Sequence, residues 1–363
     1  MSQFADLTVS WRAFHTIRKN VSSRKKNSMR TAWLVVPITC LPFTLGAISE
    51  ASFNQIYESS VRPYVQENGV EGETRMPDGA LLRYLTIRNP DERLILVVLG
   101  GHAESYVKYA ELFYDLRDLG VSIHALDQRG EGFSSRMLAD REKDYIGDST
   151  TYVADLEQFM RAVVRPGPNE RVLILGHSLG GAVAAAYAER HPSEVSGLIL
   201  SSPYLGSKAG PVAMFEVRLL DLFGAGKEYM PGGGPFTFVP FEKNKETSSR
   251  VRHERKFQDY ADSPEIRLGY PTNHWMVEMD RLGRRIRRDA GKIACPTLVL
   301  QAANDEYASR AAQDAFCAHV ARCQKVVLQG ALHEVLIERD EIRDIALAKV
   351  RAFIQDQLNR RPS

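Results

Sequence analysis

The chain has 363 residues, of which 47 are Lys or Arg and 45 are Asp or Glu. This length allows one large α/β domain with an insertion or two ordinary domains, and it can bury a sizeable core. Because the first 30 residues hold seven of the basic residues and one acid, the remainder carries 40 basic and 44 acidic residues. This mildly acidic body argues against nucleic acid as a partner of the folded domain.

The N-terminal segment, residues 1–63, is basic at first and then apolar. Residues 31–47 carry no charge, and their order after the basic stretch is typical of a secretory signal, with a possible cleavage site at 47–49. Two prolines and the short length weaken a membrane-spanning helix there. We expect an export signal or signal-anchor and a membrane-associated protein. The alternatives are a peripheral amphipathic arm or a true start at Met29, and a cytoplasmic location.

The globular domain is expected to begin at about Tyr64, with a hairpin that turns at a Pro-Asp-Gly sequence. Apolar runs then predict strands at residues 81–87, 94–99, 121–126, 171–175, 197–202, 296–301 and 325–328. Helical patterns are predicted between them at 104–119, 150–164 and 181–190. A further helix after 302–306 ends at about 320, and a last helix spans 341–358. This alternation indicates a mostly parallel sheet with helices on both faces, built from two core segments, 64–202 and 293–363.

The alternation stops in residues 203–292, which contain no run resembling a buried strand. We expect a cap insertion over the strand ends, where open α/β sheets bind their ligands. Its phenylalanines could line the site, at positions 215, 223, 236 and 238. Residues 243–292 hold thirteen Lys or Arg and eight Asp or Glu. They indicate either a solvated helix face, which is favoured, or a cationic rim facing anionic lipid.

A strand, a sharp turn and a helix meet at Ser178. Residues 171–175 are apolar, Gly176-His-Ser-Leu-Gly180 interrupts them, and an alanine-rich helical pattern follows. Such a turn exposes the serine oxygen near free N–H groups at the helix start, which would stabilise the negative oxygen formed when the serine attacks. Ser178 is therefore the candidate nucleophile.

A nucleophilic serine needs a base and a group that orients the base. His333 follows the last predicted strand and Asp305 follows the strand before it, so both belong at the same sheet edge as Ser178. Of the other histidines, His124 lies within a predicted strand, His191 and His319 lie on predicted helices, and His177 lies beside the serine and points elsewhere. Glu306 is the close rival of Asp305 as the acid. Asp127 is a distant rival because it belongs to a glycine loop.

The backbone N–H groups of Leu179 and His102 are the candidate oxyanion donors, since one follows the serine and the other lies in the loop after an early strand. The sequence contains no metal cage, phosphate loop or dinucleotide fingerprint, so we expect no metal and no cofactor. The cysteines have no metal-site spacing. Cys317 and Cys323 could pair if the protein is exported, but two ordinary thiols are the favoured interpretation. The oligomeric state is not predicted.

These residues resemble the α/β-hydrolase fold and, within it, the serine lipases of the monoacylglycerol lipase and lysophospholipase group. The resemblance spans roughly residues 64–354 and rests on the sequences at 101–112, 127–132, 176–180, 235–244, 269–275 and 330–334. It departs at Gly100-Gly101, where the group has His-Gly, and at 301–306, which lacks the glycine common before the acid.

The resemblance implies a serine ester hydrolase acting on a lysophospholipid or a monoacylglycerol, with a soluble carboxylesterase as an alternative. Transfer of the acyl group to a lipid alcohol is also open. A non-catalytic hydrolase-like binding protein is disfavoured by the complete triad. A dehalogenase or epoxide hydrolase with an aspartate nucleophile is disfavoured because the turn carries serine.

Overall fold

The computed structural model describes residues 47–360 except 91, 93 and 169. These residues belong to one compact unit. The predicted signal or anchor stretch lies outside the described residues, apart from its last residue, Ala47. None of the helices within 47–360 is both long and apolar enough to cross a bilayer.

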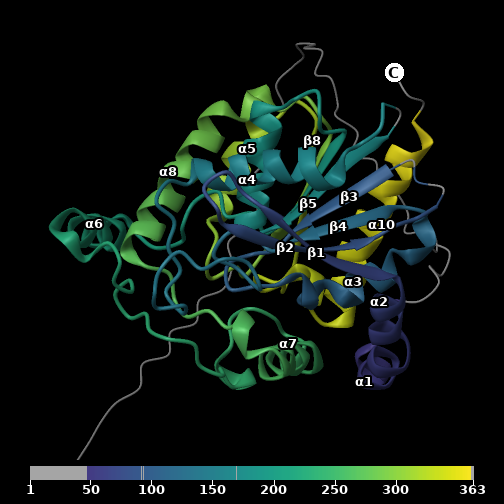
Figure 1. The fold of residues 1–363 in the computed structure, drawn as a ribbon, viewed down its shortest axis with the longest axis horizontal. Helices are drawn as coiled ribbons and strands as arrows, with labels where there is room; N and C mark the ends of the chain where they lie inside the picture. The colour runs from purple at the N-terminus through teal and green to yellow at the C-terminus, as the bar shows by residue number, and fades with distance from the viewer. Residues whose placement is uncertain (1–46, 91, 93, 169, 361–363) are drawn as a thin grey trace, which may run out of the picture. The chain divides into compact units, whose positions relative to one another are not determined.

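The centre of the fold is one sheet of eight strands in the order β1-β2-β4-β3-β5-β6-β7-β8 (Figure 1). β1 pairs with β2, and β2 with β4, in antiparallel register, and every later pairing is parallel. The bounds are β1 Gly69–Arg75, β2 Leu81–Ile87, β3 Leu94–Leu99, β4 Ser122–Leu126, β5 Arg171–His177, β6 Gly197–Ser201, β7 Thr297–Ala302 and β8 Cys323–Leu328. The predicted mostly parallel sheet of the α/β-hydrolase fold, opening with a hairpin, is confirmed.

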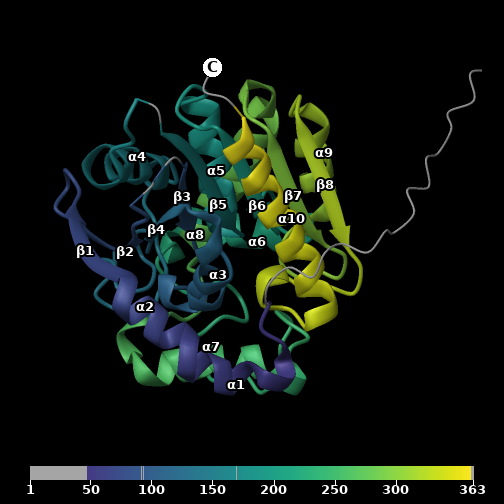
Figure 2. The same cartoon turned by 90° about the vertical axis from the view of Figure 1, so that its right-hand side faces the viewer.

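Helices cover both faces of this sheet (Figure 2). Successive strand residues point to opposite faces, so Ile95, Val97 and Leu99 of β3 join one core cluster while Leu94 and Leu96 join the other. The first cluster includes residues of α4, α5, α8 and α9, and the second includes residues of α3 and α10. The bounds are α3 Ala110–Asp115, α4 Thr150–Phe159, α5 Leu179–Arg190, α8 Asn273–Asp289, α9 Arg310–His319 and α10 Asp340–Asn359.

The folded unit begins earlier than the predicted boundary at Tyr64. Residues 50–68 are helical, as η1 Glu50–Ser52, α1 Phe53–Ile56, η2 Tyr57–Val61 and α2 Arg62–Asn68. Phe53, Tyr57 and Val61 are buried with Ala110 in a third core cluster. Their spacing of four places them on one helix face, which is why the segment packs instead of remaining a separate tail.

The insertion contains two different parts. α6 Pro211–Leu220, η6 Asp221–Ala225, η7 Phe241–Lys243, α7 Arg250–Asp262 and η8 Pro264–Ile266 form the cap. α8 instead packs on α5, with Leu282 and Ile286 fully buried in the first core cluster. The cap therefore ends before α8 and not at 292, because the apolar stripe of α8 completes a helical layer of the core.

The predicted basic rim lies on α8, where several arginines already have partners. Arg284 pairs with Asp280 at 2.6 Å, Arg288 pairs with Asp289 at 2.9 Å, and Arg287 donates to the carbonyl of Leu205. This arrangement favours the solvated helix face over a free cationic rim.

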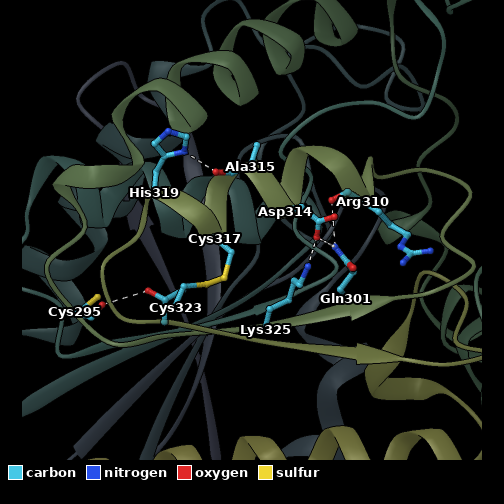
Figure 3. Close-up of a disulfide and its surroundings, with 10 residues drawn as sticks. Cys295, Gln301, Arg310, Asp314, Ala315, Cys317, His319, Cys323 and Lys325 are labelled. Atoms are coloured by element: carbon cyan, nitrogen blue, oxygen red, sulfur yellow. Dashed lines mark hydrogen bonds and ion pairs between the residues drawn. A yellow bond between two sulfur atoms is a disulfide. The ribbon is translucent and has the colours of Figure 1, made fainter. Parts of the chain in front are cut away.

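A disulfide joins Cys317 at the end of α9 to Cys323 at the start of β8 (Figure 3). The turn between helix and strand brings the two Cα atoms to 5.4 Å, within the range that a disulfide needs. The favoured prediction of two ordinary thiols is therefore wrong, because Cys317 and Cys323 are paired. Cys295 is a free, buried thiol.

Candidate active site

Ser178 lies at the turn between β5 and α5 in a strained conformation, with φ 48° and ψ −111°. A non-glycine residue rarely adopts such a positive φ, so the surrounding structure must hold it. The Ser178 N–H donates to the Ser201 carbonyl at 3.0 Å, and the Ser178 carbonyl accepts from the Tyr204 N–H at 2.9 Å. A Cβ on Gly180 would collide with the carbonyl of Leu99. The glycine therefore lets the turn pack against the end of β3.

His333 and Asp305 meet as the sequence predicts. The distance from His333 Nδ1 to Asp305 Oδ2 is 2.8 Å, and both side chains are buried. The other carboxylate oxygen of Asp305 accepts the N–H groups of Tyr307 at 2.8 Å and Ala308 at 2.9 Å. These bonds fix the carboxylate, and the carboxylate in turn orients the imidazole.

The two groups shift each other's pKa in opposite directions. Burial alone would raise the pKa of Asp305, but the bond from His333 and the two backbone N–H groups hold it below its usual value. Burial alone would lower the pKa of His333, but the Asp305 carboxylate raises it above its usual value. The pair thus favours a charged carboxylate beside an imidazole that accepts a proton readily.

The rival acids are committed elsewhere. Glu306 is solvent-exposed and pairs with Lys208 at 2.9 Å. Asp127 is buried among its own loop and accepts the N–H groups of Tyr106 at 2.6 Å and Phe133 at 2.8 Å. Only Asp305 of the three contacts His333 among the described residues.

The predicted oxyanion donors remain available. Gly101 N–H donates to Glu104 Oε2 at 2.6 Å, and Gly180 N–H donates to the Gly100 carbonyl at 3.0 Å. Neither the N–H of His102 nor that of Leu179 has a partner within the described part of the chain. The side chain of His102 packs against Trp275, with ring centroids 5.1 Å apart.

The sequence analysis missed a network of buried charged side chains behind the triad. His177 Nε2 lies 3.1 Å from Glu334 Oε2, and the His177 and His333 rings are 4.8 Å apart. Lys108 pairs with both Glu104 and Glu334. The spacing of four between Glu104 and Lys108 was a signal for part of this network, but their association with Glu334 requires the tertiary fold.

The cap joins the same network through Lys256. This α7 residue is buried, and its Nζ lies 2.8 Å from Glu246 Oε2 and 3.7 Å from Glu334 Oε1. Two buried glutamates, Glu104 and Glu334, and the partly exposed Glu246 therefore face Lys108 and Lys256 beside the catalytic histidine. Glu104, His177 and Glu334 could supply ligand atoms to a metal ion. The positive charges of the lysines already balance the carboxylates there, so no metal ion is needed for charge balance.

Aromatic residues of the cap pack next to the oxyanion loop. Phe236, Phe238, Phe257 and Tyr260 stack edge to face or tilted, with centroids 5.1 to 6.2 Å apart. The hydroxyl of Tyr260 donates to the carbonyl of Ala103 at 2.6 Å, directly after His102. Two of the four phenylalanines expected to line the site, Phe236 and Phe238, belong to this cluster.

Comparison with known proteins shows which family this chain belongs to. A family model described as serine aminopeptidase, S33 matches residues 90–340. Lysophospholipase L2 of Escherichia coli (strain K12) is 35% identical over 294 residues, which cover 78% of this chain and 86% of that protein. The monoacylglycerol lipase of Mycolicibacterium smegmatis is 25% identical over 255 residues, 69% of this chain and 85% of that protein.

Among solved structures, the monoacylglycerol lipase of Paleococcus ferrophilus superposes with a TM-score of 0.61 at 20% identity. The match covers 76% of this chain and 99% of that chain. At this identity the likeness supports the fold.

Proposed function

Because the chain belongs to the serine aminopeptidase S33 family of α/β hydrolases, we propose that it hydrolyses the acyl ester of lysophospholipids. The observation that carries this proposal is the 35% identity to lysophospholipase L2 across 86% of that protein. The strained serine and the bonded His333–Asp305 pair support a carboxylic ester hydrolase that works through a covalent acyl-enzyme.

In the proposed reaction, His333 Nε2 takes the proton of Ser178 as the serine oxygen attacks the ester carbonyl. The N–H groups of His102 and Leu179 hold the resulting oxyanion. Collapse of this intermediate expels the lipid alcohol, which receives the proton from His333, and leaves the acyl group on Ser178. Water then attacks with His333 as base, and the fatty acid leaves while the proton returns to Ser178.

The cap supplies features that suit a lipid. The aromatic cluster at Phe236 and Phe257 lies beside the oxyanion loop through Tyr260, and each methylene buried there would contribute about 0.8 kcal/mol of binding. On α6 and η6, Val212, Phe215 and Phe223 are 79%, 59% and 81% exposed. Exposed apolar side chains in such number favour docking on a membrane surface, which we propose as the working location.

The test compares lysophosphatidylcholine, lysophosphatidylethanolamine, a monoacylglycerol and a short p-nitrophenyl ester, with purified wild type and Ser178→Ala. We expect the highest kcat/KM for a lysophospholipid, and no turnover by the variant at preserved stability. A higher kcat/KM for monoacylglycerol or for the short ester would replace the proposal by a monoacylglycerol lipase or a carboxylesterase. Activity of Ser178→Ala near wild type would remove Ser178 from the mechanism.

The acid is tested by a matched pair of variants. Asp305→Asn should lower kcat by roughly 10⁴-fold, since the imidazole loses the group that fixes its tautomer. Glu306→Gln, which alters the exposed carboxylate of the next residue in the same loop, should leave kcat nearly unchanged. The reverse result in a steady-state assay would transfer the role to Glu306.

A further inference from the structure

Three side chains beside the oxyanion loop form a group that the proposed hydrolysis does not use. His102 follows β3, Glu131 follows β4 and Asp144 lies in the loop before α4. Each offers a possible ligand atom, and these atoms all lie within 4.8 Å of one another. Glu131 and Asp144 are each only 1% exposed. Their carboxylates therefore face each other away from bulk water.

Most polar atoms of this group have no hydrogen-bond partner among the described residues. His102 Nε2, Glu131 Oε1 and both carboxylate oxygens of Asp144 are buried and have no hydrogen-bond partner among the described residues. The second oxygen of Glu131 accepts one long bond, from Glu104 N–H at 3.3 Å. An unpaired buried charge costs several kcal/mol. Two adjacent ones therefore require a compensating cation or proton.

Among the described residues, no lysine or arginine forms an ion pair with either carboxylate. Arg136 is the basic residue whose charge acts on both, but its guanidinium donates to the backbone carbonyls of Gly130 and Arg267. No ion pair joins it to Glu131 or Asp144 in the part of the chain that the structure describes. The group thus differs from the network behind the triad, where lysines fill this role.

The separation of the donor atoms matches that of ligands on one metal ion. His102 Nε2 lies 3.3 Å from Asp144 Oδ2, a contact that is an ion pair only if the imidazole is protonated, and burial lowers the pKa of His102 to about 4. Ligand atoms at about 2.0–2.1 Å from a tetrahedral ion lie about 3.3 Å apart. An imidazole and two carboxylates suit Zn²⁺ or Mn²⁺ better than Mg²⁺ or Ca²⁺, which prefer oxygen ligands alone.

We propose that His102, Glu131 and Asp144 bind one divalent transition-metal ion, Zn²⁺ or Mn²⁺. The ion joins the loops after β3 and β4 to the loop before α4, and its charge balances the two carboxylates. It takes no part in the acyl transfer. Its place beside His102 makes it a structural support for the loop that carries the proposed oxyanion donor.

Mn²⁺ provides the direct test, because its free-ion electron paramagnetic resonance signal disappears on binding. The full chain is first stripped of metal with a chelator. Mn²⁺ is then titrated and followed by its resonance signal, and in parallel Zn²⁺ is titrated and the Tm is measured by thermal denaturation. We expect one site per chain, with a rise in Tm as the ion binds the folded state. Asp144→Asn and Glu131→Gln should each weaken Mn²⁺ binding by roughly tenfold or more.

Asp140→Asn is the matched control, since Asp140 is an exposed carboxylate of the same loop, and it should bind Mn²⁺ like wild type. Without metal, Asp144→Asn should be at least as stable as wild type, because it removes one of two repelling buried charges. Binding weaker than about 1 mM in wild type, or equal affinity in wild type, Asp144→Asn and Glu131→Gln, would overturn the proposal. These binding outcomes are independent of ester turnover, so failure here leaves the proposed function standing.

Discussion

The two helices of the cap, α6 and α7, contact the rest of the molecule in opposite ways. α7 is bound through buried charge. Its Arg252 donates to Glu111 at 3.0 Å, to the carbonyls of Glu338 and Ile48 at 3.0 and 2.7 Å, and to Asp340 at 3.0 Å. α6 makes its described contacts mainly with α8, and turns Val212 and Phe215 to solvent.

This difference indicates that the two parts of the insertion have different roles. The α7 part connects core segments that are far apart in the sequence and places Lys256 next to Glu334, the neighbour of the catalytic histidine. Its geometry is therefore coupled to the triad. The α6 part has few polar constraints and presents apolar side chains, as a surface that meets lipid would. Perturbing α7 should affect folding and chemistry, whereas perturbing α6 should affect only access to lipid.

The strongest test of this division removes the buried guanidinium of α7. Arg252→Met removes the bonds to Glu111 and to two carbonyls, and leaves Arg343, at 3.3 Å, as the remaining cation on the buried Glu111. This loss should lower the free energy of unfolding by roughly 3–5 kcal/mol. Urea unfolding followed by circular dichroism measures it. The control is Arg250→Met, which removes an exposed pair with Glu242 from the same helix and should change little. Equal effects of the two variants would show that α7 is not anchored through Arg252.

The second test uses the lysine that faces the catalytic loop. Lys256→Met removes a positive charge near Glu246 and Glu334, so the remaining negative charge should raise the pKa of His333 further. The base works only when neutral, and its pKa already lies above the usual value. Activity should therefore fall as pH decreases through that pKa, and in the variant this fall should begin at higher pH.

The pH profile of kcat/KM for a short soluble ester reports this shift without a contribution from lipid binding. An unchanged acidic limb in Lys256→Met would contradict electrostatic coupling between α7 and His333. Lys227→Met is the control, because Lys227 belongs to the same insertion but lies over the ring of Tyr145. It should keep the wild-type profile.

The third test concerns α6. The double variant Phe215→Ser and Phe223→Ser removes two of the exposed rings and should reduce turnover of lysophospholipid in vesicles by about tenfold, through weaker membrane binding. Turnover of the short ester should stay the same, and stability should change by no more than about 0.5 kcal/mol, since surface substitutions rarely do more. Vesicle sedimentation separates binding from chemistry. Equal vesicle binding by wild type and variant would remove α6 from the proposed surface.

The sequence by itself determined the features that short local patterns encode, such as the core strands and the turn at Ser178. The apolar runs predict the core strands, and a parallel sheet puts their ends at one edge, so Ser178, Asp305 and His333 could be named without coordinates. The structure brings Asp305 and His333 into contact, while their catalytic roles stay predictions. The fold class and the family follow from the same motifs.

The tertiary structure decided what depends on contacts between distant segments. Arg252 and Glu111 are 141 positions apart, and no periodicity of either helix reveals their pairing. The helical start at residue 50, the assignment of α8 to the core and the Cys317–Cys323 bond likewise require knowing which surfaces meet. Unpaired buried atoms, as at Glu131 and Asp144, exist only once the fold has excluded water and other partners, so a linear pattern cannot reveal them.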